Sequence, residues 1–297
     1  MEFDKRSTAE NVTAGLDLRG RTVVITGVNS GLGLESMRVL AGRGARVLGL
    51  ARTQRKADEA CAQVGGECIG LPCELSDLRS VAECSERIRA LGTPIDVLMT
   101  NAGIMAPARL SHAHGVEMQF ATNHLGHFVL INRLLDRLQA ASRSRIVILS
   151  SAAHNLTVKG GIDFGNLDAS TGYDPWRFYG QSKLANLLTA RALARRLRDS
   201  NVSVNAVHPG VIHTNLARDV GGLFSRVMML AARLAAKTVE QGAATQCFVA
   251  AHPAVEGKSG GYYADCRLAG TSRHGKDEAL AEQLWKQSAE LTKSYLD

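Results

Sequence analysis

The sequence is poor in aromatic residues and has no long apolar run. Aromatic side chains make up 5% of the 297 residues, so alanine, leucine and valine must fill most of the core. No segment of about 18 uncharged apolar residues occurs, which argues against a membrane-spanning helix. The first 20 residues are polar and lack the apolar region of a secretory signal peptide. We therefore expect a cytoplasmic protein with no membrane span.

Cysteine is also infrequent, and its spacing does not suit a metal site. The six cysteines are Cys61, Cys68, Cys73, Cys84, Cys247 and Cys266. None of them forms a Cys-x-x-Cys pair, and neither His112/His114 nor His124/His127 has a carboxylate or third histidine at ligand spacing. We therefore expect no metal site, and we expect these histidines to be surface residues or to be hydrogen-bonded. We also expect all six thiols to be reduced.

The charge distribution does not indicate a nucleic-acid partner. The chain has 35 basic and 28 acidic residues, a net charge of +7, but its arginines are spread along helical stretches without a basic run. Such residues are typical of solvated helix faces, and the positive excess would also suit a small polyanionic cofactor. The apolar fraction of 45% and the charged fraction of 21% are those of a globular protein, and they exclude a disordered or collagen-like chain.

Short apolar runs alternate with helical patterns along the chain. The predicted strands cover residues 21–26, 45–51, 67–72, 95–100, 145–150, 202–207 and 261–265. The predicted helices cover residues 31–42, 54–64, 76–90 (N-cap Ser76), 116–140, 178–198 and 214–251, the last with a break near Gly221 and Gly222. Because crossovers between parallel strands are right-handed, we predict an α/β fold with a doubly wound parallel sheet (Rossmann fold) of about seven strands and helices on both faces. The whole of residues 1–297 is expected to be a single domain, with residues 1–19 as a polar N-terminal extension.

A glycine-rich turn follows the first predicted strand. Gly27, Gly31 and Gly33 have Gly-x3-Gly-x-Gly spacing and lead into a helix. A turn without side chains lets the backbone approach a pyrophosphate, and the helix N-terminus offers N–H donors and a positive dipole end to that anion. Three glycines could equally be ordinary turn residues, but the strand–turn–helix context favours a dinucleotide site.

Tyr179 and Lys183 carry the sharpest chemical signal. They are four residues apart on a predicted helix, so both side chains can enter one site. A phenol titrates at about pH 10, and it can act as general acid or base near neutrality only where an ammonium or an oxidised nicotinamide stabilises the phenolate. Ser150 and Ser151 close a predicted strand and so face the same crevice. Taken alone, a Tyr-x3-Lys pair also occurs by chance on helices.

Two asparagines complete the candidate set. Asn101-Ala102-Gly103 ends a predicted strand, where it could line a ligand crevice or form an ordinary turn. Asn123 lies within a predicted helix and could equally be a surface residue. Neither motif indicates a function by itself.

Together these motifs strongly resemble those of the short-chain dehydrogenases/reductases, from about residue 20 to residue 265. In chain order they are Thr26-Gly27-x3-Gly31-x-Gly33, Asn101-Ala102-Gly103, Asn123, Ser151, Tyr179-x3-Lys183 and His208-Pro209-Gly210. The resemblance implies reversible hydride transfer between a nicotinamide and a carbonyl or alcohol group.

The resemblance also implies a role for each residue. Tyr179 would donate or accept the proton, and Lys183 would lower its pKa and bind the nicotinamide ribose. Ser151 would orient the substrate oxygen, and Asn123 would hold a water in a proton relay. The residues expected at the cofactor are Gly27, Asn29, Ser30, Gly31, Leu32, Gly33, Arg52, Glu74, Leu75, Asn101, Ala102, Gly103, Tyr179, Lys183, Pro209, Gly210, Val211 and Thr214.

Finer features resemble the retinol dehydrogenases and the WW-domain-containing oxidoreductases. They lie in residues 120–128, 179–186 and 208–214. The chain departs from this branch in lacking the amino-terminal membrane segment of many retinol dehydrogenases and the WW module. It also has Glu74 where the family usually has an aspartate near the adenine. The family usually pairs through the helix that carries Tyr179 and the one before it, which implies a homodimer or tetramer, although this branch varies.

Two segments are expected around the substrate. Ser151 and Tyr179 are 28 residues apart, more than is common in the family, so residues 154–177 contain an inserted loop that would sit over the active site. The aromatic residues of this loop are Phe164, Tyr173 and Trp176. Residues 214–251 would hold the family's substrate lid and the helix that follows it. The methionines and leucines of residues 224–236 suit an apolar pocket, although core or dimer packing would explain them equally well.

The end of the second predicted strand indicates the cofactor. NAD-preferring members of the family carry an acidic residue at the position of Ala51, where its carboxylate binds the adenosine ribose. Here Arg52 follows directly, and a guanidinium can hold a 2′-phosphate through charge-assisted bonds. Arg52 could also be an ordinary surface arginine. We expect NADP(H) as the preferred cofactor and NAD(H) as the second choice.

The sequence thus predicts an NADP(H)-dependent oxidoreductase that interconverts an alcohol and a ketone or aldehyde on a hydrophobic small molecule. One alternative is a catalytically silent dinucleotide-sensing protein of the same fold. The presence together of Tyr179, Lys183, Ser151 and Asn123 argues against it. Another is a sugar-nucleotide epimerase or dehydratase, which would usually carry Gly-x2-Gly-x2-Gly spacing and a larger carboxyl-terminal domain.

Overall fold

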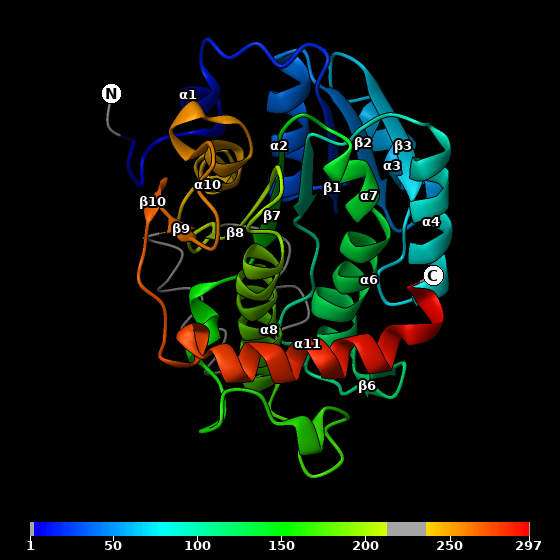
Figure 1. Cartoon of the computed structure of the whole chain (residues 1–297), viewed down its shortest axis with the longest axis vertical. Helices are drawn as coiled ribbons and strands as arrows, with labels where there is room; N and C mark the ends of the chain where they lie inside the picture. Colours follow the sequence, from blue (N-terminus) through cyan, green and yellow to red (C-terminus); the bar gives the residue numbers. More distant parts are fainter. Residues whose placement is uncertain (1–2, 213–235, 297) are drawn as a thin grey trace.

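An eight-stranded sheet, in the order β10-β9-β8-β7-β4-β1-β2-β3, forms the centre of the computed structural model, which describes residues 3–212 and 236–296 (Figure 1). Its strands are β1 Thr22–Thr26, β2 Arg46–Ala51, β3 Cys68–Pro72, β4 Val97–Thr100, β7 Ser144–Leu149, β8 Val202–His208, β9 Tyr262–Ala264 and β10 Arg267–Leu268. All neighbouring strands pair in parallel except β9 and β10. The strands β5 His112–Ala113 and β6 Val116–Glu117 form a separate antiparallel ribbon.

The order of the strands places a crevice at the carboxyl ends of β1 and β4. From β1 the chain proceeds outward through β2 and β3, and from β4 it proceeds in the opposite direction through β7 and β8. In an open parallel sheet, ligands bind where the strand order reverses in this way. The two central strands, β1 and β4, are buried on both faces over their whole lengths, as expected for the middle of a parallel sheet.

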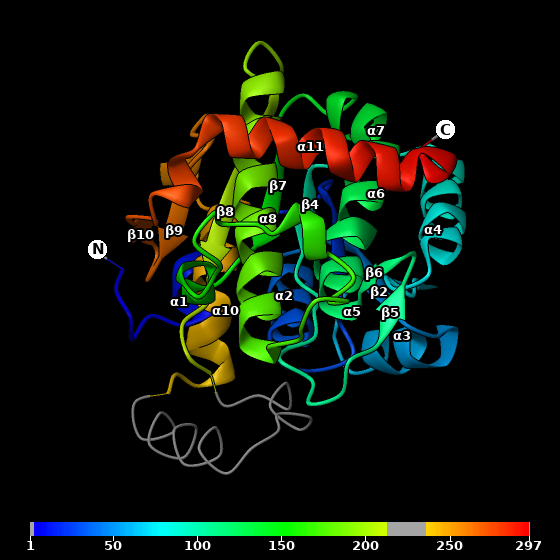
Figure 2. The same ribbon diagram turned by 90° about the horizontal axis from the view of Figure 1, so that it is seen from below.

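Helices cover both faces of the sheet (Figures 1 and 2). One face packs against α1 Ala9–Thr13, α2 Gly31–Gly42, α3 Gln54–Cys61 and α10 Val239–Ala251. The other face packs against α4 Leu78–Ala90, α6 Gly126–Arg133 and α8 Pro175–Arg196. The short helices α5 Met118–Phe120 and α7 Leu135–Gln139 flank α6, and α11 Glu278–Thr292 runs crosswise over α8 and α6. No helix in the described part of the chain has the length and apolar character needed to cross a bilayer.

Three details differ from the sequence prediction. The sheet has eight strands and not about seven, because the two-residue β10 turns back along β9 at the edge. The helix predicted over residues 116–140 is interrupted: β6 occupies its start, and a π-helix, Ala121–Leu125, precedes α6. The N-cap of α4 is Asp77, whose side chain accepts the Arg79 N–H, whereas Ser76 bonds to Glu74.

The expectation of six reduced thiols is wrong for one pair, because Cys61 and Cys68 form a disulfide. Cys61 ends α3 and Cys68 begins β3, and the connection between the two elements brings their Cα atoms to 5.5 Å. The other four cysteines are free and buried. The disulfide therefore closes only a short local loop at the edge of the sheet.

The N-terminal segment, expected to be a polar extension, contains the short helix α1. Thr8 and Asn11 form a capping box at its start, in which each side chain accepts the backbone N–H of the other. Ala9 and Val12 are fully buried against α2 and α10. The apolar face of α1 thus joins the core on that side of the sheet.

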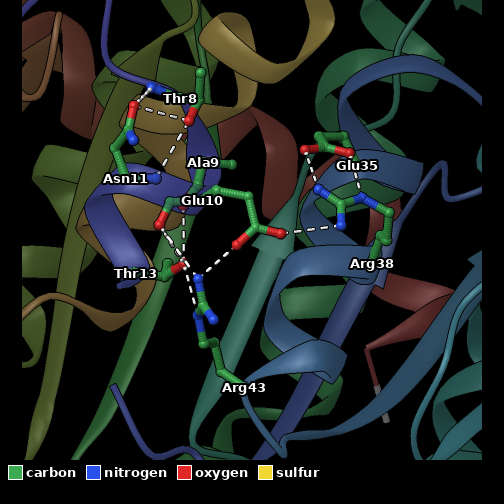
Figure 3. A network of polar contacts seen from close by, with 8 residues as sticks. All are labelled: Thr8, Ala9, Glu10, Asn11, Thr13, Glu35, Arg38 and Arg43. Atoms are coloured by element: carbon green, nitrogen blue, oxygen red, sulfur yellow. Dashed lines mark hydrogen bonds and ion pairs between the residues drawn. The ribbon is translucent and has the colours of Figure 1, made fainter. Parts of the chain in front are cut away.

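An ion-pair network fixes the position of α1 on α2 (Figure 3). Glu10 accepts from Arg38 at 3.0 Å and from Arg43 at 2.5 Å, and Arg38 also forms a bidentate pair with Glu35. Glu10 and Arg38 are each nearly half exposed, so solvent screens these bonds and each contributes at most about 1 kcal/mol. The network therefore determines the direction of α1, and burial of its apolar side chains supplies most of the binding energy.

Candidate active site

The glycine-rich turn between β1 and α2 is closed too tightly for side chains. A Cβ on Gly33 would lie 2.2 Å from the Gly27 carbonyl oxygen. Gly27 has φ of +74°, and a Cβ there would lie 2.9 Å from the Cβ of Ala102. Two of the predicted glycines are therefore required by the approach of α2 and of β4 to the turn.

The start of α2 suits an anion. Its N-cap residue, Ser30, makes no side-chain capping bond to the first N–H groups of this 12-residue helix. Asn29 and Ser30 are exposed, Leu32 is half-buried, and Gly31 has φ of +57°. The exposed N–H groups and the dipole end fit a pyrophosphate.

The end of β2 lies beside this turn, because the N–H groups of Gly27 and Val28 both donate to the Leu50 carbonyl. Ala51 is buried, and the Arg52 side chain is exposed. Within residues 3–212 and 236–296, Arg52 forms no ion pair, whereas Arg55 of α3 pairs with Glu59. Arg52 therefore has a guanidinium available to a ligand at the turn.

Asn101 lies beneath the glycine-rich turn. Its Nδ2 donates to the Thr26 carbonyl at 2.9 Å, and its own N–H donates to Thr26 Oγ1 at 2.9 Å. Gln246 of α10 donates to Asn101 Oδ1 at 3.2 Å and to Ser36 of α2 at 2.6 Å. These bonds join β1, β4, α2 and α10 below the expected cofactor. Sequence reasoning missed Gln246, because only the fold brings α10 to this turn.

Gly103 packs so closely against the polar residues of the site that a side chain there would collide with them. A Cβ at this position would lie 2.9 Å from Asn123 Oδ1 and 3.5 Å from Lys183 Nζ. Asn123 lies in the π-helix, where its Oδ1 accepts the Ile104 N–H at 2.8 Å and its Nδ2 donates to Ser182 Oγ at 3.0 Å. Asn123 is fully buried, which rejects the interpretation of a surface residue.

Tyr179, Lys183 and Ser151 come together between α8 and the end of β7. Lys183 Nζ lies 5.6 Å from the centre of the Tyr179 ring and donates to the Leu149 carbonyl at 3.3 Å. Ser151 accepts the Ala153 N–H at 3.1 Å and hydrogen-bonds to the Tyr179 hydroxyl. Tyr179 and Lys183 are both buried. The neighbouring Ser150 is instead bonded to the Lys183 carbonyl, so it faces away from this group.

Burial governs the protonation of Tyr179 and Lys183. It raises the pKa of Tyr179 to about 12, and the hydrogen bond with Ser151 opposes the change. It lowers the pKa of Lys183 to about 8. At neutral pH the site therefore holds a phenol and an ammonium, which is the state needed to give a proton to a carbonyl.

Glu74 and Leu75 have partners within the protein. The Glu74 carboxylate accepts both the N–H and the hydroxyl of Ser76, at 3.1 and 2.9 Å. Leu75 is buried, and its carbonyl packs so closely on Gly126 that a Cβ there would lie 2.3 Å away. These contacts connect the end of β3 to α6.

The segment after β8 contains the remaining predicted cofactor residues. Pro209 precedes Gly210, which has φ of +96°, and a Cβ on Gly210 would lie 2.9 Å from Cδ of the Lys237 side chain. Val211 is 59% exposed, and its carbonyl accepts the Lys237 N–H. Thr214 and residues 224–235 of the expected lid lie outside the described residues.

The aromatic residues of the loop before α8 have different surroundings. Trp176 lies edge-on to Tyr179, with ring centres 6.2 Å apart. Tyr173 donates to the Pro107 carbonyl at 2.8 Å, and Phe164 packs against the core. Trp176, which lies in the first turn of α8, is therefore the one of these three aromatic residues that adjoins Tyr179.

Comparison with known proteins identifies the class. Residues 21–221 match the short chain dehydrogenase family, and the chain belongs to this family of NAD(P)-dependent oxidoreductases. Relatives place it in the retinol dehydrogenase-like branch. It is 39% identical to human retinol dehydrogenase 14 over 90% of this chain and 85% of the relative. It is 41% identical to the chloroplastic short-chain dehydrogenase TIC 32 B of Brassica napus, over 98% of this chain and 95% of the relative.

Solved structures agree with this assignment. A protein from Mycobacterium paratuberculosis has a TM-score of 0.78 and 35% identity, covering 95% of this chain and 97% of its own. A structure from Beutenbergia cavernae, described as an NAD(P)-dependent gluconate 5-dehydrogenase with bound NADP, has a TM-score of 0.65 and 27% identity, covering 84% and 96% of the two chains. Membership of this family explains the fold, and it makes the protein an oxidoreductase that acts on alcohol and carbonyl groups.

Proposed function

We propose that this enzyme interconverts an alcohol and a ketone or aldehyde on an apolar substrate, with NADP(H) as its preferred cofactor. The observation that carries the proposal is the meeting of Ser151 with the buried Tyr179 and Lys183, where Gly103 packs closely against Asn123 and Lys183. When bound, the nicotinamide supplies or accepts the hydride. The turn from Gly27 to Gly33 would hold its pyrophosphate, and Lys183 its ribose.

The side chains then account for the proton. In the reductive direction the Ser151 hydroxyl donates to the substrate oxygen and orients it, and the Tyr179 phenol transfers its proton to that oxygen as the C–H bond forms. The Lys183 ammonium stabilises the phenolate that remains. In the oxidative direction the Tyr179 phenolate takes the proton back from the alcohol.

An apolar substrate is supported by the surroundings of Tyr179. Trp176 presents its ring edge-on to Tyr179, and Val211, next to the expected nicotinamide end, is 59% exposed. Leu156, which follows the turn that begins at Ser151, is 52% exposed. Large apolar side chains left exposed near an active site suit a ligand with an apolar body.

Turnover measurements test the proposed function. We expect the protein to reduce apolar aldehydes or ketones with NADPH and to oxidise the corresponding alcohols with NADP⁺. A panel graded in chain length, with hydrophilic carbonyl compounds of equal reactivity as controls, would show kcat/KM rising with apolar size. Cofactor binding without any turnover across the panel would instead favour the silent dinucleotide-sensing protein.

Replacing Arg52 should change the cofactor preference. A hydrogen bond to a charged group contributes about 1.5–3 kcal/mol, so we expect kcat/KM to favour NADPH over NADH by roughly ten- to a hundredfold. Arg52→Ala should remove this preference by weakening NADPH alone. The double variant Ala51→Asp/Arg52→Ala should reverse it, since the carboxylate repels the phosphate and can accept from the ribose hydroxyls.

Arg55→Ala is the matched control for this prediction, because Arg55 is also exposed but is paired with Glu59. It should leave the ratio of the two kcat/KM values unchanged. Equal values for NADPH and NADH in the wild-type enzyme would mean that Arg52 does not reach the phosphate.

The location and assembly of the protein are also proposals. We keep the cytoplasm as the expected location, although the Brassica napus relative is named chloroplastic. We keep a homodimer or tetramer as the expected assembly, with the contact surface open. Fractionation and light scattering would test the two proposals separately.

A further inference from the structure

His127 connects two parts of the candidate active site that are far apart in the chain. It lies on α6, four residues after Asn123, and is almost fully buried. Its Nε2 is 2.9 Å from Thr26 Oγ1, at the end of β1. Its Nδ1 is 3.0 Å from the main-chain oxygen of Asn123, in the π-helix. One ring therefore spans from the strand below the cofactor turn to the helix turn beside Lys183.

The bonds around Thr26 determine which ring nitrogen carries the proton. Thr26 Oγ1 accepts the N–H groups of Asn101 and Ala102, at 2.9 and 3.0 Å, so both of its lone pairs are engaged. Its own hydrogen must then point to His127 Nε2, which accepts it. The proton of the neutral ring is consequently on Nδ1, which donates to the Asn123 oxygen.

The neutral form of the ring is also the one its surroundings favour. Burial lowers the pKa of His127 to about 4, the bond to Asn123 opposes this change, and the nearby Lys183 charge adds to it. His124, buried one position after Asn123, bonds to Ser288 of α11 and not to the Asn123 oxygen. At neutral pH a neutral His127 thus accepts from Thr26 through Nε2 and donates to the Asn123 main-chain oxygen through Nδ1.

The Asn123 carbonyl accepts a side-chain hydrogen bond at a point where the helix geometry changes. It lies in a π-helix, where the regular α-helical pairing of carbonyl and N–H groups is interrupted. The Asn123 side chain is held separately by Ile104 and Ser182. In the described part of the chain, His127 provides the side-chain hydrogen bond to the main-chain oxygen.

We infer that His127 is a positioning residue for proton transfer, which holds the π-helix turn at Asn123, whose side chain lies with Lys183 around Gly103, in the arrangement that proton delivery toward Tyr179 requires. The inference rests on the proposed function. The ring does not pass the proton on itself, because its Nε2 faces a hydroxyl oxygen whose lone pairs already accept two backbone N–H groups. Its effect is exerted through Asn123.

Two substitutions separate the two ends of the ring. In His127→Asn the amide nitrogen occupies the place of Nδ1 and can still donate to the Asn123 oxygen. In His127→Gln the amide reaches the place of Nε2 and can accept from Thr26, but it leaves the Asn123 oxygen without its donor. Both variants lose the ring, so their loss of stability should be similar.

We expect His127→Gln to lower kcat by about ten- to a hundredfold, the effect of small misplacements in catalytic geometry, and His127→Asn to stay within about threefold of wild type. NADPH affinity, measured by fluorescence titration, should be equal in the two. The solvent deuterium isotope effect on kcat should increase in His127→Gln alone, and small amine buffers should partly restore its turnover. The corresponding His124 pair is the control and should show no such difference.

Equal kcat values for His127→Asn and His127→Gln, in the presence of wild-type turnover, would overturn the inference and leave the proposed function standing. Absence of turnover in the wild type would overturn both. A measurement independent of activity is histidine-selective ¹⁵N NMR of the wild-type protein at pH 7, with His127→Asn to assign the signal. A neutral ring protonated on Nδ1 is expected, and a ring protonated on Nε2 would also overturn the inference.

Discussion

Tyr179→Phe is expected to lower kcat by about 10²–10⁴-fold, the usual contribution of a general acid or base, while cofactor affinity and folding stay near wild type. The substitution removes only the hydroxyl. The ring keeps its buried position and its edge-on contact with Trp176. Steady-state kinetics with NADPH and a reactive apolar aldehyde measure the effect, and fluorescence titration and urea unfolding measure the other two quantities.

Tyr295→Phe is the matched control, since Tyr295 lies at the carboxyl-terminal end, near His114. It should leave kcat unchanged. A Tyr179→Phe enzyme with the wild-type kcat would refute the role of the phenol, because no other change at that position removes so little.

Lys183→Met is expected to stabilise the folded protein while it disables the site. Burial lowers the pKa of Lys183 from its ordinary value of 10.5 to about 8, so the folded chain binds the proton less tightly than the unfolded chain. Below about pH 8 the folded state carries the full cost of the buried ammonium, about 3 kcal/mol. That cost decreases as the pH rises from about 8 to 10.5 and is absent above 10.5. Methionine has no such cost at any pH.

The difference in unfolding free energy between Lys183→Met and wild type should therefore be largest at pH 7 and vanish near pH 10.5. Urea unfolding at several pH values measures it, and Lys286→Met, at an exposed position, controls for the loss of a charge. The same variant should lose turnover and bind NADPH more weakly, because one ammonium serves both. A destabilised Lys183→Met protein at pH 7 would show that the ammonium has a net favourable role in folding.

The sequence predicted the sheet well where a strand is a continuous apolar run, as in β1 and β4. It failed where structure depends on distant contacts. The pattern of residues 116–140 is helical throughout, yet residues 121–125 form a π-helix, in which the Asn123 side chain bonds to Ile104 and to Ser182. The edge strand β10 has only two residues, and pairing with β9 defines it.

In the candidate site, too, the residues defined by local spacing were predictable, and those defined by distant contacts were not. Tyr179 and Lys183 were predictable because their four-residue spacing places both side chains on one face of a helix, and because the pair stands in order with the other motifs of the family. In the sequence, His127 stands out only as half of the His124/His127 pair, which has no third ligand at metal spacing. Its partners, Thr26 and the Asn123 carbonyl, meet it only after β1 and α6 have packed together. Because every residue has a main-chain oxygen, the identity of the accepting residue does not indicate such a hydrogen bond.

The final helix, α11, has a consequence for assembly. Trp285 packs edge-on against Phe128 of α6 at 4.9 Å, and Arg196 of α8 lies 4.2 Å over the Trp285 ring. The helix therefore occupies surface of α8 and α6 that a second subunit would need for pairing through these helices (Figure 2). Its Ser288 also bonds to His124 inside the π-helix. A symmetric dimer built through that face would therefore require α11 to move away from α8 and α6.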